Sequence, residues 1–378
     1  MSDWLVPLTD IAMPEQDVQA VLDCLKDGWL TMGPRTKGFE QALAEYVDTP
    51  HAVTVSSGTA ALHLACLAAG IGEGDEVIVP AFTFVASAAA PRYVGATPVL
   101  CDVKSPVDFN IDVEDAERRI TSRTRAIVAT HFCGYPADLQ ALRSLCDEHG
   151  LILIEDCAQA IGARFDDSGR QVGTVGELGA FSFFSKKQLC VGEGGMVATA
   201  DERLAERVRQ LRSHALTSST WDRHRGHDPS YDVTDIGFNY RLDEPRAALG
   251  MSRLERLTEN IETRRMLVRA YRERLAALPG IGLCFDEQAV ARSSHFAFPV
   301  LLADREARDA LRRELNTMGI QTTWYPALQS FSGYTQFASG ELPRAGEVAD
   351  RHCALPLSST MDEADVDTVV AGVRNALA

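Results

Sequence analysis

The chain has 378 residues, 46% of them hydrophobic and 24% charged, and its formal net charge is −16. A chain of this length predicts a large domain and a smaller one, and its acidic balance disfavours nucleic acid as a partner. Nine cysteines without a CxxC pair, no apolar run of membrane-spanning length and an N-terminus without a signal core predict a reduced, cytoplasmic protein with neither a metal site nor a disulfide framework.

Strand-like and helix-like segments alternate through the first two-thirds of the chain. Apolar runs lie at residues 52–55, 76–79, 97–101, 126–130 and 151–154, and a further apolar strand ends at Ser182. Strands that are apolar throughout and alternate with helices predict a mostly parallel central sheet flanked by helices on both faces. The predicted class is therefore α/β, with ligands expected beyond the carboxyl ends of the strands.

The last third of the chain predicts a smaller α+β domain. A pattern rich in Arg and Glu covers residues 242–278 and is expected to form one long, solvated connecting helix. A strand at 295–301, a helix at 305–318 and a final helix at 362–377 follow. We divide the chain into a large domain, residues 1–250, and a small C-terminal domain, residues 251–378. The N-terminal helix at 14–27 could pack on either.

A turn of small residues follows the first strand. Ser57, Gly58 and Thr59 open an alanine-rich helix, where free backbone N–H groups and the helix dipole favour a phosphate. The alternative is an ordinary N-cap, which every helix needs. The turn therefore needs partners elsewhere in the chain before it indicates a ligand.

Aromatic and polar groups follow two later strands. Phe84 comes after the strand at 76–79 and could stack on a flat ring, although phenylalanine is more often part of the core. Asp156 follows the strand at 151–154, and a carboxylate there needs a positive partner such as a protonated pyridine nitrogen. Gln159 could bind a hydroxyl of the same ring. The alternative for Glu155 is to cap the next helix.

The most informative segment contains Lys187. An apolar strand delivers Ser182 and then Lys187 into a turn, which the glycine-rich run at 192–195 follows. A lysine amine held at the end of a buried strand reacts with aldehydes once desolvation or a neighbouring cation lowers its pKa. The alternative is a surface lysine after a strand, and Lys186 is the rival nucleophile.

Residues 237–241, Gly-Phe-Asn-Tyr-Arg, add an amide and a guanidinium suited to phosphate or carboxylate recognition. With this segment, the motifs together resemble the sugar aminotransferases of the DegT type, which are pyridoxal-phosphate (PLP) enzymes of the aspartate-aminotransferase fold (fold type I). The resemblance runs from residue 28 to residue 326. Each motif alone is weak, and their occurrence together in the family's order is specific.

The resemblance implies a PLP site with a role for each matched residue. Lys187 matches the lysine that binds the cofactor covalently, because the family's offset from Ser182 falls on it and not on Lys186. Asp156 matches the partner of the ring nitrogen, and Gln159 lies beside the ring hydroxyl. The other implied cofactor contacts are the phosphate cradle of Ser57, Gly58, Thr59 and Ser182, the stacking ring of Phe84, and Asn239 from a neighbouring subunit. The match at Asn239 implies a homodimer with shared active sites.

The implied reaction is a PLP-dependent transamination. L-glutamate would donate its amino group to a nucleotide-linked (dTDP- or UDP-) 4-keto or 3-keto sugar, giving an amino sugar for natural-product or cell-surface glycan biosynthesis. Thr31 and Tyr325 are the implied sugar contacts. Family members often have a histidine before Tyr-Pro and another shortly after it, whereas this chain reads Trp-Tyr-Pro-Ala-Leu-Gln at 324–329.

Residues 221–227 are richer in basic side chains than the usual connection in the family. An acidic protein needs a local basic patch to hold a dianion, so we expect Arg223, His224 and Arg225 to contact the sugar diphosphate. The alternative is a solvated loop without a ligand.

Other functions stay open within the same fold. A keto cyclitol could replace the nucleotide sugar, although it carries no diphosphate for a basic loop to bind. A PLP-dependent sugar dehydratase of this fold replaces the lysine with histidine, and Lys187 speaks against it. A non-catalytic regulator would be expected to have lost Lys187 or Asp156, and both are present.

Overall fold

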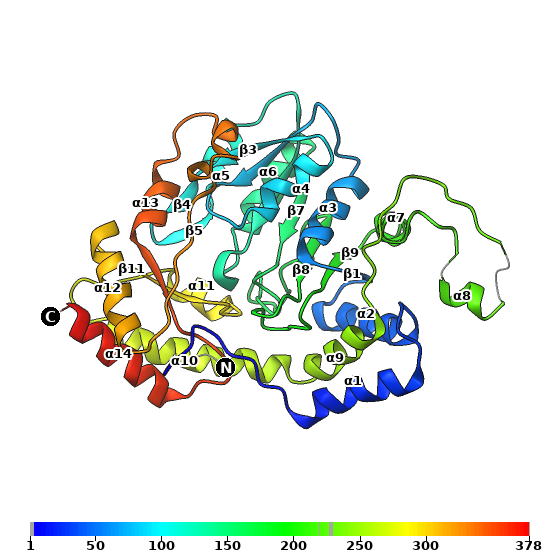
Figure 1. Ribbon diagram of the computed structural model, residues 1–378. Helices are drawn as coiled ribbons and strands as arrows, with labels where there is room; N and C mark the ends of the chain where they lie inside the picture. The colour runs from blue at the N-terminus through cyan, green and yellow to red at the C-terminus, as the bar shows by residue number, and fades with distance from the viewer. Residues whose placement is uncertain (1–3, 219, 227–229, 378) are drawn as a thin grey trace.

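The computed structural model describes residues 4–218, 220–226 and 230–377, and a seven-stranded sheet forms its centre (Figure 1). The strand order is β1-β9-β8-β7-β6-β2-β3. The strands are β1 (His51–Val55), β2 (Glu76–Pro80), β3 (Thr97–Cys101), β6 (Thr124–Thr130), β7 (Ile152–Asp156), β8 (Leu178–Ser182) and β9 (Gly195–Thr199). From β8 to β3 all neighbours pair in parallel, and β9 runs antiparallel to both β1 and β8. The predicted mostly parallel sheet is confirmed.

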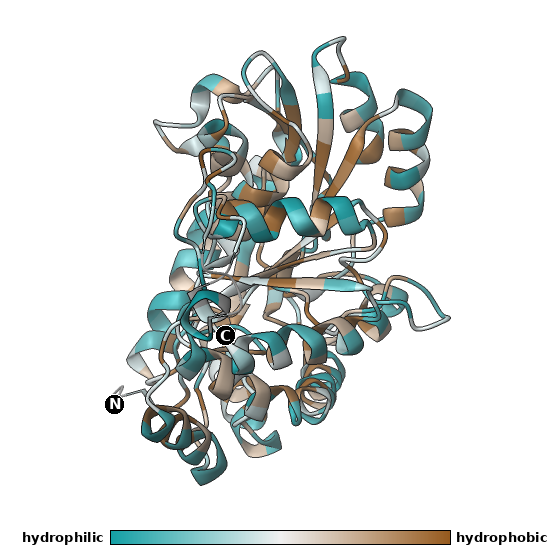
Figure 2. Ribbon diagram, turned by 90° about the vertical axis from the view of Figure 1, so that its right-hand side faces the viewer, coloured by the Kyte–Doolittle hydropathy of each residue, from teal (hydrophilic) through white to brown (hydrophobic). Residues whose placement is uncertain are grey.

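Helices cover both faces of this sheet. The helices α2 (Pro34–Val47) and α6 (Leu139–His149) lie on one face, and α3 (Gly58–Ala68), α4 (Ala86–Tyr93) and α7 (Glu202–Arg212) lie on the other. Successive residues of a strand point to opposite faces, so Val77 and Val79 join one core cluster and Ile78 joins the other. The strands are brown and the outer helix faces mostly teal in Figure 2, as a sheet buried on both sides requires.

A second, three-stranded antiparallel sheet follows later in the chain. It has the order β10-β11-β12 and packs with the C-terminal helices. Its elements are β10 (Gly282–Leu283), α11 (Glu287–Arg292), β11 (Phe298–Leu301), α12 (Arg305–Thr317), α13 (Pro343–Arg351), β12 (His352–Leu355) and α14 (Glu363–Leu377). The remaining elements are α1 (Glu15–Asp27), the hairpin β4 (Val103–Ser105) and β5 (Asp108–Ile111), α5 (Val113–Arg118) and α8 (Thr220–His224). The division of the chain at residue 250 stays a prediction.

The single helix predicted over 242–278 is wrong. Two helices, α9 (Glu244–Leu254) and α10 (Leu257–Leu275), occupy this range and lie along the base of the molecule in Figure 1. At the break the Arg256 guanidinium donates a hydrogen bond to the Ser252 carbonyl (3.0 Å), and the Arg256 backbone N–H donates to the Arg253 carbonyl instead. The i→i−4 bond that would continue the helix is thereby lost. Nor is α10 solvated, because it buries Ile261, Val268 and other apolar side chains.

The strand predicted at 295–301 is also shorter than expected. β11 begins at Phe298, because the preceding residues bond to another part of the chain. His295 has a left-handed backbone (φ 50°), and the Phe296 N–H donates to the Cys133 carbonyl at 2.9 Å. This detour brings the Phe296 ring close to the Lys187 amine, which lies 4.4 Å from the ring centre.

Buried carboxylates join the N-terminal helices to α9. Asp17 of α1 is fully buried and accepts from Ser252 (2.7 Å) and Arg256 (2.6 Å), which settles that α1 packs on α9. Glu244 accepts from the backbone N–H groups of Gly33, Arg35 and Thr36, each at 2.8 Å. A carboxylate at the start of α2 satisfies N–H groups that have no partner within the helix.

All nine cysteines are buried and none forms a disulfide. Within the ranges that the structure describes, no helix has both the length and the apolar character needed to cross a bilayer.

Candidate active site

Lys187 lies in a tight loop between β8 and β9. Its backbone N–H donates to the Phe184 carbonyl (2.8 Å), and Val191 donates to the Phe183 carbonyl (2.9 Å). The Phe183 N–H reaches across to the Gly194 carbonyl at 2.8 Å. These bonds close the loop at its base, so Lys187 is held at the carboxyl end of a buried strand, as the sequence predicted.

The side chains of the neighbouring Lys186 and Lys187 differ in their exposure to solvent. Lys186 is exposed, whereas Lys187 is half-buried as a residue and its amine is enclosed, lying 4.4 Å from the centre of the Phe296 ring. Burial lowers the pKa of the Lys187 amine to about 8, against the opposing effects of Asp156 and Cys133. Desolvation, one of the two causes we expected, therefore leaves about a tenth of this amine unprotonated at pH 7, far more than in an ordinary lysine.

Asp156 ends β7 and is almost completely buried. Its carboxylate accepts from the Ser87 hydroxyl (2.6 Å) and the Ala158 N–H (3.1 Å). The Thr83 hydroxyl lies 2.8 Å from that of Ser87 and 3.1 Å from that of Thr130, so a chain of hydroxyls supports the carboxylate. Ser87 was missed from the sequence, because a serine inside a helix gives no sign of which carboxylate it will meet.

Gln159 is fixed next to the loop that carries Lys187. Its Oε1 accepts from the Cys133 N–H at 2.7 Å, and its backbone carbonyl accepts from Gln188 at 2.8 Å. Gln188 also donates to the Ser294 hydroxyl at 3.0 Å. With its oxygen engaged, Gln159 has its amide NH₂ available to donate to a ring hydroxyl.

The predicted phosphate turn meets Ser182 in space. The Ser57 hydroxyl caps α3 by accepting from the Ala60 N–H at 3.1 Å. A Cβ on Gly58 would lie 2.7 Å from the Ser182 Cβ, so only glycine allows β8 to end against this helix start. The Gly58 and Thr59 N–H groups belong to the first turn of the helix, which has no acceptors within the helix. The ordinary N-cap and the anion cradle therefore coexist here.

The other two expected cofactor contacts are exposed. Phe84 follows β2 and keeps 66% of its surface exposed, which leaves its ring face free to stack. Asn239 is exposed and pairs with Ser213 at the base of a long arm, of which residues 213–218, 220–226 and 230–239 are described. The next residue, Tyr240, accepts from the Ser56 N–H at 2.8 Å, so this segment runs beside the phosphate turn of its own chain.

The predicted sugar contacts fall into two groups. Thr31 is half-buried in the turn between α1 and α2, two residues after Trp29. The Trp29 ring packs against the rings of Trp221 (4.8 Å) and His224 (4.7 Å), which joins this turn to the arm. Tyr325 lies elsewhere, packed edge-on against Phe132 at 5.5 Å.

The basic side chains of the arm lie against aromatic rings. Arg223 lies over Tyr231 (4.7 Å) and donates to the Ser218 carbonyl at 2.6 Å, and Arg225 lies over Trp221 at 5.7 Å. His227, the last basic residue of the predicted segment, lies outside the described residues. His224 and Arg225 are nevertheless exposed, so the diphosphate contact and the solvated loop both stay predictions.

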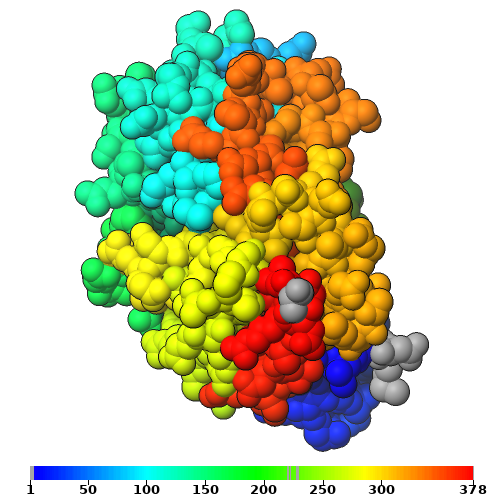
Figure 3. All heavy atoms as spheres, turned by 90° about the vertical axis from the view of Figure 1, so that its left-hand side faces the viewer, coloured from blue at the N-terminus to red at the C-terminus, as the bar shows by residue number. Residues whose placement is uncertain are grey.

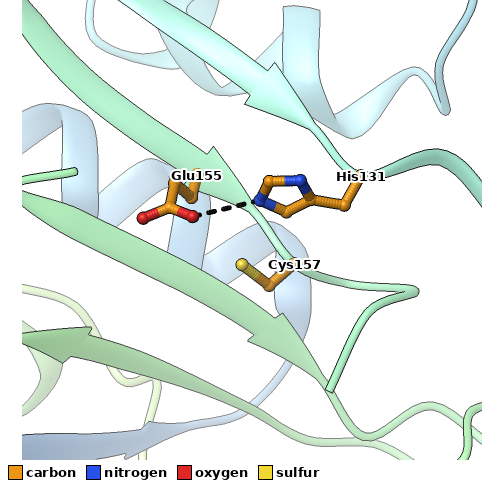
Figure 4. A group of neighbouring side chains, drawn as sticks. All are labelled: His131, Glu155 and Cys157. Carbon is orange, nitrogen blue, oxygen red and sulfur yellow. Dashed lines mark hydrogen bonds and ion pairs between the residues drawn. The ribbon is translucent and has the colours of Figure 1, made fainter. Parts of the chain in front are cut away.

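Figure 4 shows a buried group, His131, Glu155 and Cys157, whose ligand atoms lie within 4.8 Å of one another. His131 Nδ1 accepts from the Ala137 N–H (3.0 Å), so Nε2 carries the proton that it donates to Glu155 (3.1 Å). Neither nitrogen is left to bind a metal. Burial alone would raise the pKa of Glu155, but the bonds from His131 and two glycine N–H groups lower it.

Glu155 has a structural role that differs from the helix cap we considered. Its oxygens accept from the N–H groups of Gly173 (2.6 Å), Val175 (2.8 Å) and Gly176 (2.7 Å). The carboxylate thus holds the loop that leads into β8. The residues directly after Asp156 form a turn and not a helix. The helix-cap interpretation of Glu155 is wrong.

Comparison with known proteins identifies the family to which a chain with these residues belongs. Residues 12–374 match the DegT/DnrJ/EryC1/StrS aminotransferase family. The chain belongs to this family. It is therefore an aminotransferase, and the resemblance inferred from the motifs is confirmed.

Relatives of this aminotransferase cover its whole length. GDP-perosamine synthase of Caulobacter vibrioides is 35% identical over 100% of both chains. The solved structure of DesV from S. venezuelae is 37% identical, with a TM-score of 0.89 over 98% of both chains. A putative sugar aminotransferase from Streptococcus pneumoniae, solved in a PLP form, is 25% identical, with a TM-score of 0.90 over 98% of both chains. The fold is that of the family, and its cofactor is PLP.

The residues of this chain fit that cofactor. A phosphate matches the helix start at Gly58 and Thr59 beside Ser182, since that start offers N–H groups and a positive dipole end. An aldehyde matches the enclosed amine of Lys187, and a ring nitrogen that carries a proton matches the buried carboxylate of Asp156. The donor set thus suits an aldehyde, a phosphate and a cationic ring together.

Replacing Lys187 by alanine should abolish covalent attachment of PLP, because the enclosed amine is removed. We expect loss of the visible absorbance of the lysine-bound cofactor and no trapping by borohydride, measured by spectroscopy and intact mass. Lys186→Ala is the matched control and should be trapped like the wild-type protein. Trapping that persists in Lys187→Ala and disappears in Lys186→Ala would reverse the assignment.

The reactivity of Lys187 in the apoenzyme should rise through a midpoint near pH 8. Its pKa is lowered to about 8 from 10.5, so the nucleophilic amine forms at a lower pH than in an ordinary lysine. Acetylation rates at Lys187, followed by peptide mass spectrometry across pH 6–11, measure this. The denatured protein is the control and should titrate at the ordinary value of about 10.4. Coincident profiles in the two states would show that burial does not act on this amine.

Proposed function

We propose that this aminotransferase moves an amino group from L-glutamate to a nucleotide-linked 4-keto or 3-keto sugar. The observation that carries the proposal is the enclosed Lys187 amine beside Asp156, in a chain that matches sugar aminotransferases over its whole length. The relative named GDP-perosamine synthase adds GDP to the dTDP and UDP carriers expected from the sequence. The product is an amino sugar for natural-product or cell-surface glycan biosynthesis.

In this proposal Lys187 moves the proton. PLP, when bound, supplies the electron sink that makes the amino acid's α-hydrogen acidic. The Lys187 amine would take that proton from the α-carbon and deliver one to the cofactor's C4′, a role that its lowered pKa of about 8 suits. The Phe296 ring beneath the amine excludes water and still tolerates the ammonium form.

Asp156 and its neighbours orient the ring of the cofactor. The Ser87 hydroxyl and the Ala158 N–H fix the carboxylate, whose remaining lone pairs face a protonated ring nitrogen. Gln159 donates to the ring hydroxyl, Phe84 stacks on the ring, and the turn at 57–59 with Ser182 holds the phosphate. Apart from the apolar Phe84, these contacts are preorganised dipoles or charges, which favour the transition state without rearrangement.

We further propose a homodimer in which Asn239 contacts the partner's cofactor phosphate. Support comes from the arm at 213–239, which in Figure 1 reaches away from the sheet. Three of its apolar side chains are exposed: Tyr231 at 58%, Val233 at 54% and Ile236 at 83%. Side chains of this kind are usually covered by another protein surface, and a second copy of this chain would cover them.

The proposed reaction is tested with purified enzyme, glutamate and a panel of GDP-, dTDP- and UDP-linked keto sugars. We expect release of 2-oxoglutarate and a product heavier by one mass unit than its keto acceptor, because the carbonyl oxygen is replaced by an amino group and a hydrogen on the same carbon. Lys187→Ala is the negative control. A keto cyclitol in the same panel tests the alternative acceptor, and amination of the cyclitol alone would overturn the nucleotide-sugar proposal.

Neutralising the arm arginines should weaken the sugar half-reaction. We propose that Arg223 and Arg225, with His224, contact the diphosphate, so Arg223→Gln with Arg225→Gln should raise the sugar KM by about tenfold for the loss of charged hydrogen bonds. The half-reaction with glutamate should be unchanged. Arg203→Gln, an exposed arginine on α7, is the matched control. An equal fall in both half-reactions would remove the arm from sugar recognition.

A further inference from the structure

A buried histidine holds the backbone of the segment that carries Tyr325. The Tyr325 N–H donates to His352 Nε2 at 2.9 Å. The two rings also stack, with their centres 5.7 Å apart and their planes within 9° of each other. His352 begins β12 and is completely buried, so both its ring and its nitrogen fix the position of Tyr325.

The hydrogen bonds of His352 fix its protonation state. Nδ1 lies 2.8 Å from the Val348 carbonyl, which can only accept, so Nδ1 carries the proton. Nε2 accepts from Tyr325 and is therefore bare. Burial lowers the pKa of His352 to about 4, and the charges of Arg308 and Arg312 act in the same direction. The neutral form is the one that can hold Tyr325.

The side chains that contact Trp324 and Tyr325 hydrogen-bond to the backbone of α13. Val348 and Ala349 lie near the end of this helix, and Ala349 accepts from Arg308 at 2.6 Å. Arg308 in turn lies over the Trp324 ring at 4.4 Å. Two neighbouring residues, Trp324 and Tyr325, are thus contacted by Arg308 and His352. Both of these side chains hydrogen-bond to backbone carbonyls in the last turn of α13.

The other end of α13 is tied to the central sheet. Asp102, directly after β3, accepts from the N–H groups of Arg344 (3.1 Å) and Ala345 (2.7 Å). Arg344 also bonds to Asp112. Figure 3 shows this contact as the orange segment lying against the cyan one. Hydrogen bonds at its two ends therefore connect α13 to the central sheet and, through His352, to Tyr325.

The same histidine contacts the loop that follows β2. Phe82 packs edge-on against His352 at 5.0 Å, and it lies two residues before Phe84, the proposed stacking ring. The Leu328 N–H donates to the Ala81 carbonyl at 2.7 Å, which joins the far end of the Tyr325 segment to that loop. Tyr325 is thus placed relative to the proposed cofactor ring through His352.

We propose that His352 is a positioning residue that holds Tyr325 where it contacts the keto sugar, and so determines affinity for this acceptor. The inference rests on the proposed function for the acceptor, and on the hydrogen bonds and stacking above for the link between the two residues. His352 touches neither substrate nor cofactor in this proposal, and acts through Tyr325.

Two variants separate the parts of this contact. His352→Phe keeps an aromatic ring but leaves the Tyr325 N–H without an acceptor, and should raise the sugar KM about tenfold with little change in the glutamate half-reaction. His352→Gln places an oxygen where Nε2 lies and should stay within about threefold of the wild type. Val369→Ala, a truncation of a buried residue of α14, controls for lost stability alone and should lower Tm without changing the sugar KM.

Amide hydrogen exchange at Tyr325 gives a readout that needs no substrate. Exchange should be faster in His352→Phe than in the wild type and close to the wild type in His352→Gln. If the wild-type enzyme aminates no keto sugar, the proposed function fails, and exchange alone then decides whether His352 holds Tyr325. Unchanged exchange in His352→Phe, or an equal fall of both half-reactions, would overturn the inference. Faster exchange with an unchanged sugar KM would overturn it as well, because Tyr325 would then not contact the acceptor.

Discussion

The site depends on two opposite charges held at the carboxyl edge of a buried sheet. Asp156 ends β7, and Lys187 follows the end of the neighbouring strand β8. Burial disfavours the charged lysine, while the carboxylate favours it, and the balance leaves the pKa of the amine at about 8. An exposed pair would be solvated by water and would keep ordinary pKa values, so the chemistry proposed for Lys187 requires the closed sheet around it.

Close backbone approaches keep this edge of the sheet closed. Gly58 lets the start of α3 meet Ser182, where any side chain would collide with the serine Cβ. The two carboxylate oxygens of Glu155 accept hydrogen bonds from the backbone of residues 173–176. These bonds hold the segment before β8 next to β7, with which β8 then pairs. These contacts fix the backbone from which the side chains of the site project.

The second sheet and its helices hold the remaining wall of the site. Phe296 comes from the chain just before β11 and covers the Lys187 amine. Tyr325 is placed by His352, and α13 links that contact to Asp102 at the end of β3. The large sheet thus presents the groups that fit PLP, and the later part of the chain sets the space in which an acceptor would lie.

The sequence determined the fold class and most of the proposed cofactor residues, because these lie at the ends of apolar strands and so at one edge of a parallel sheet, whereas Asn239 followed from the family resemblance alone. Lys187, Asp156, Gln159 and the turn at 57–59 were found in this way. The tertiary structure alone decided the break at Arg256, the short β11, the role of Glu155, and the supporting contacts of Ser87, Phe296 and His352. In each of these the partner is distant in the chain or is a side chain that competes with a backbone bond. No local pattern of residues encodes such a contact, which exists only once the chain has folded.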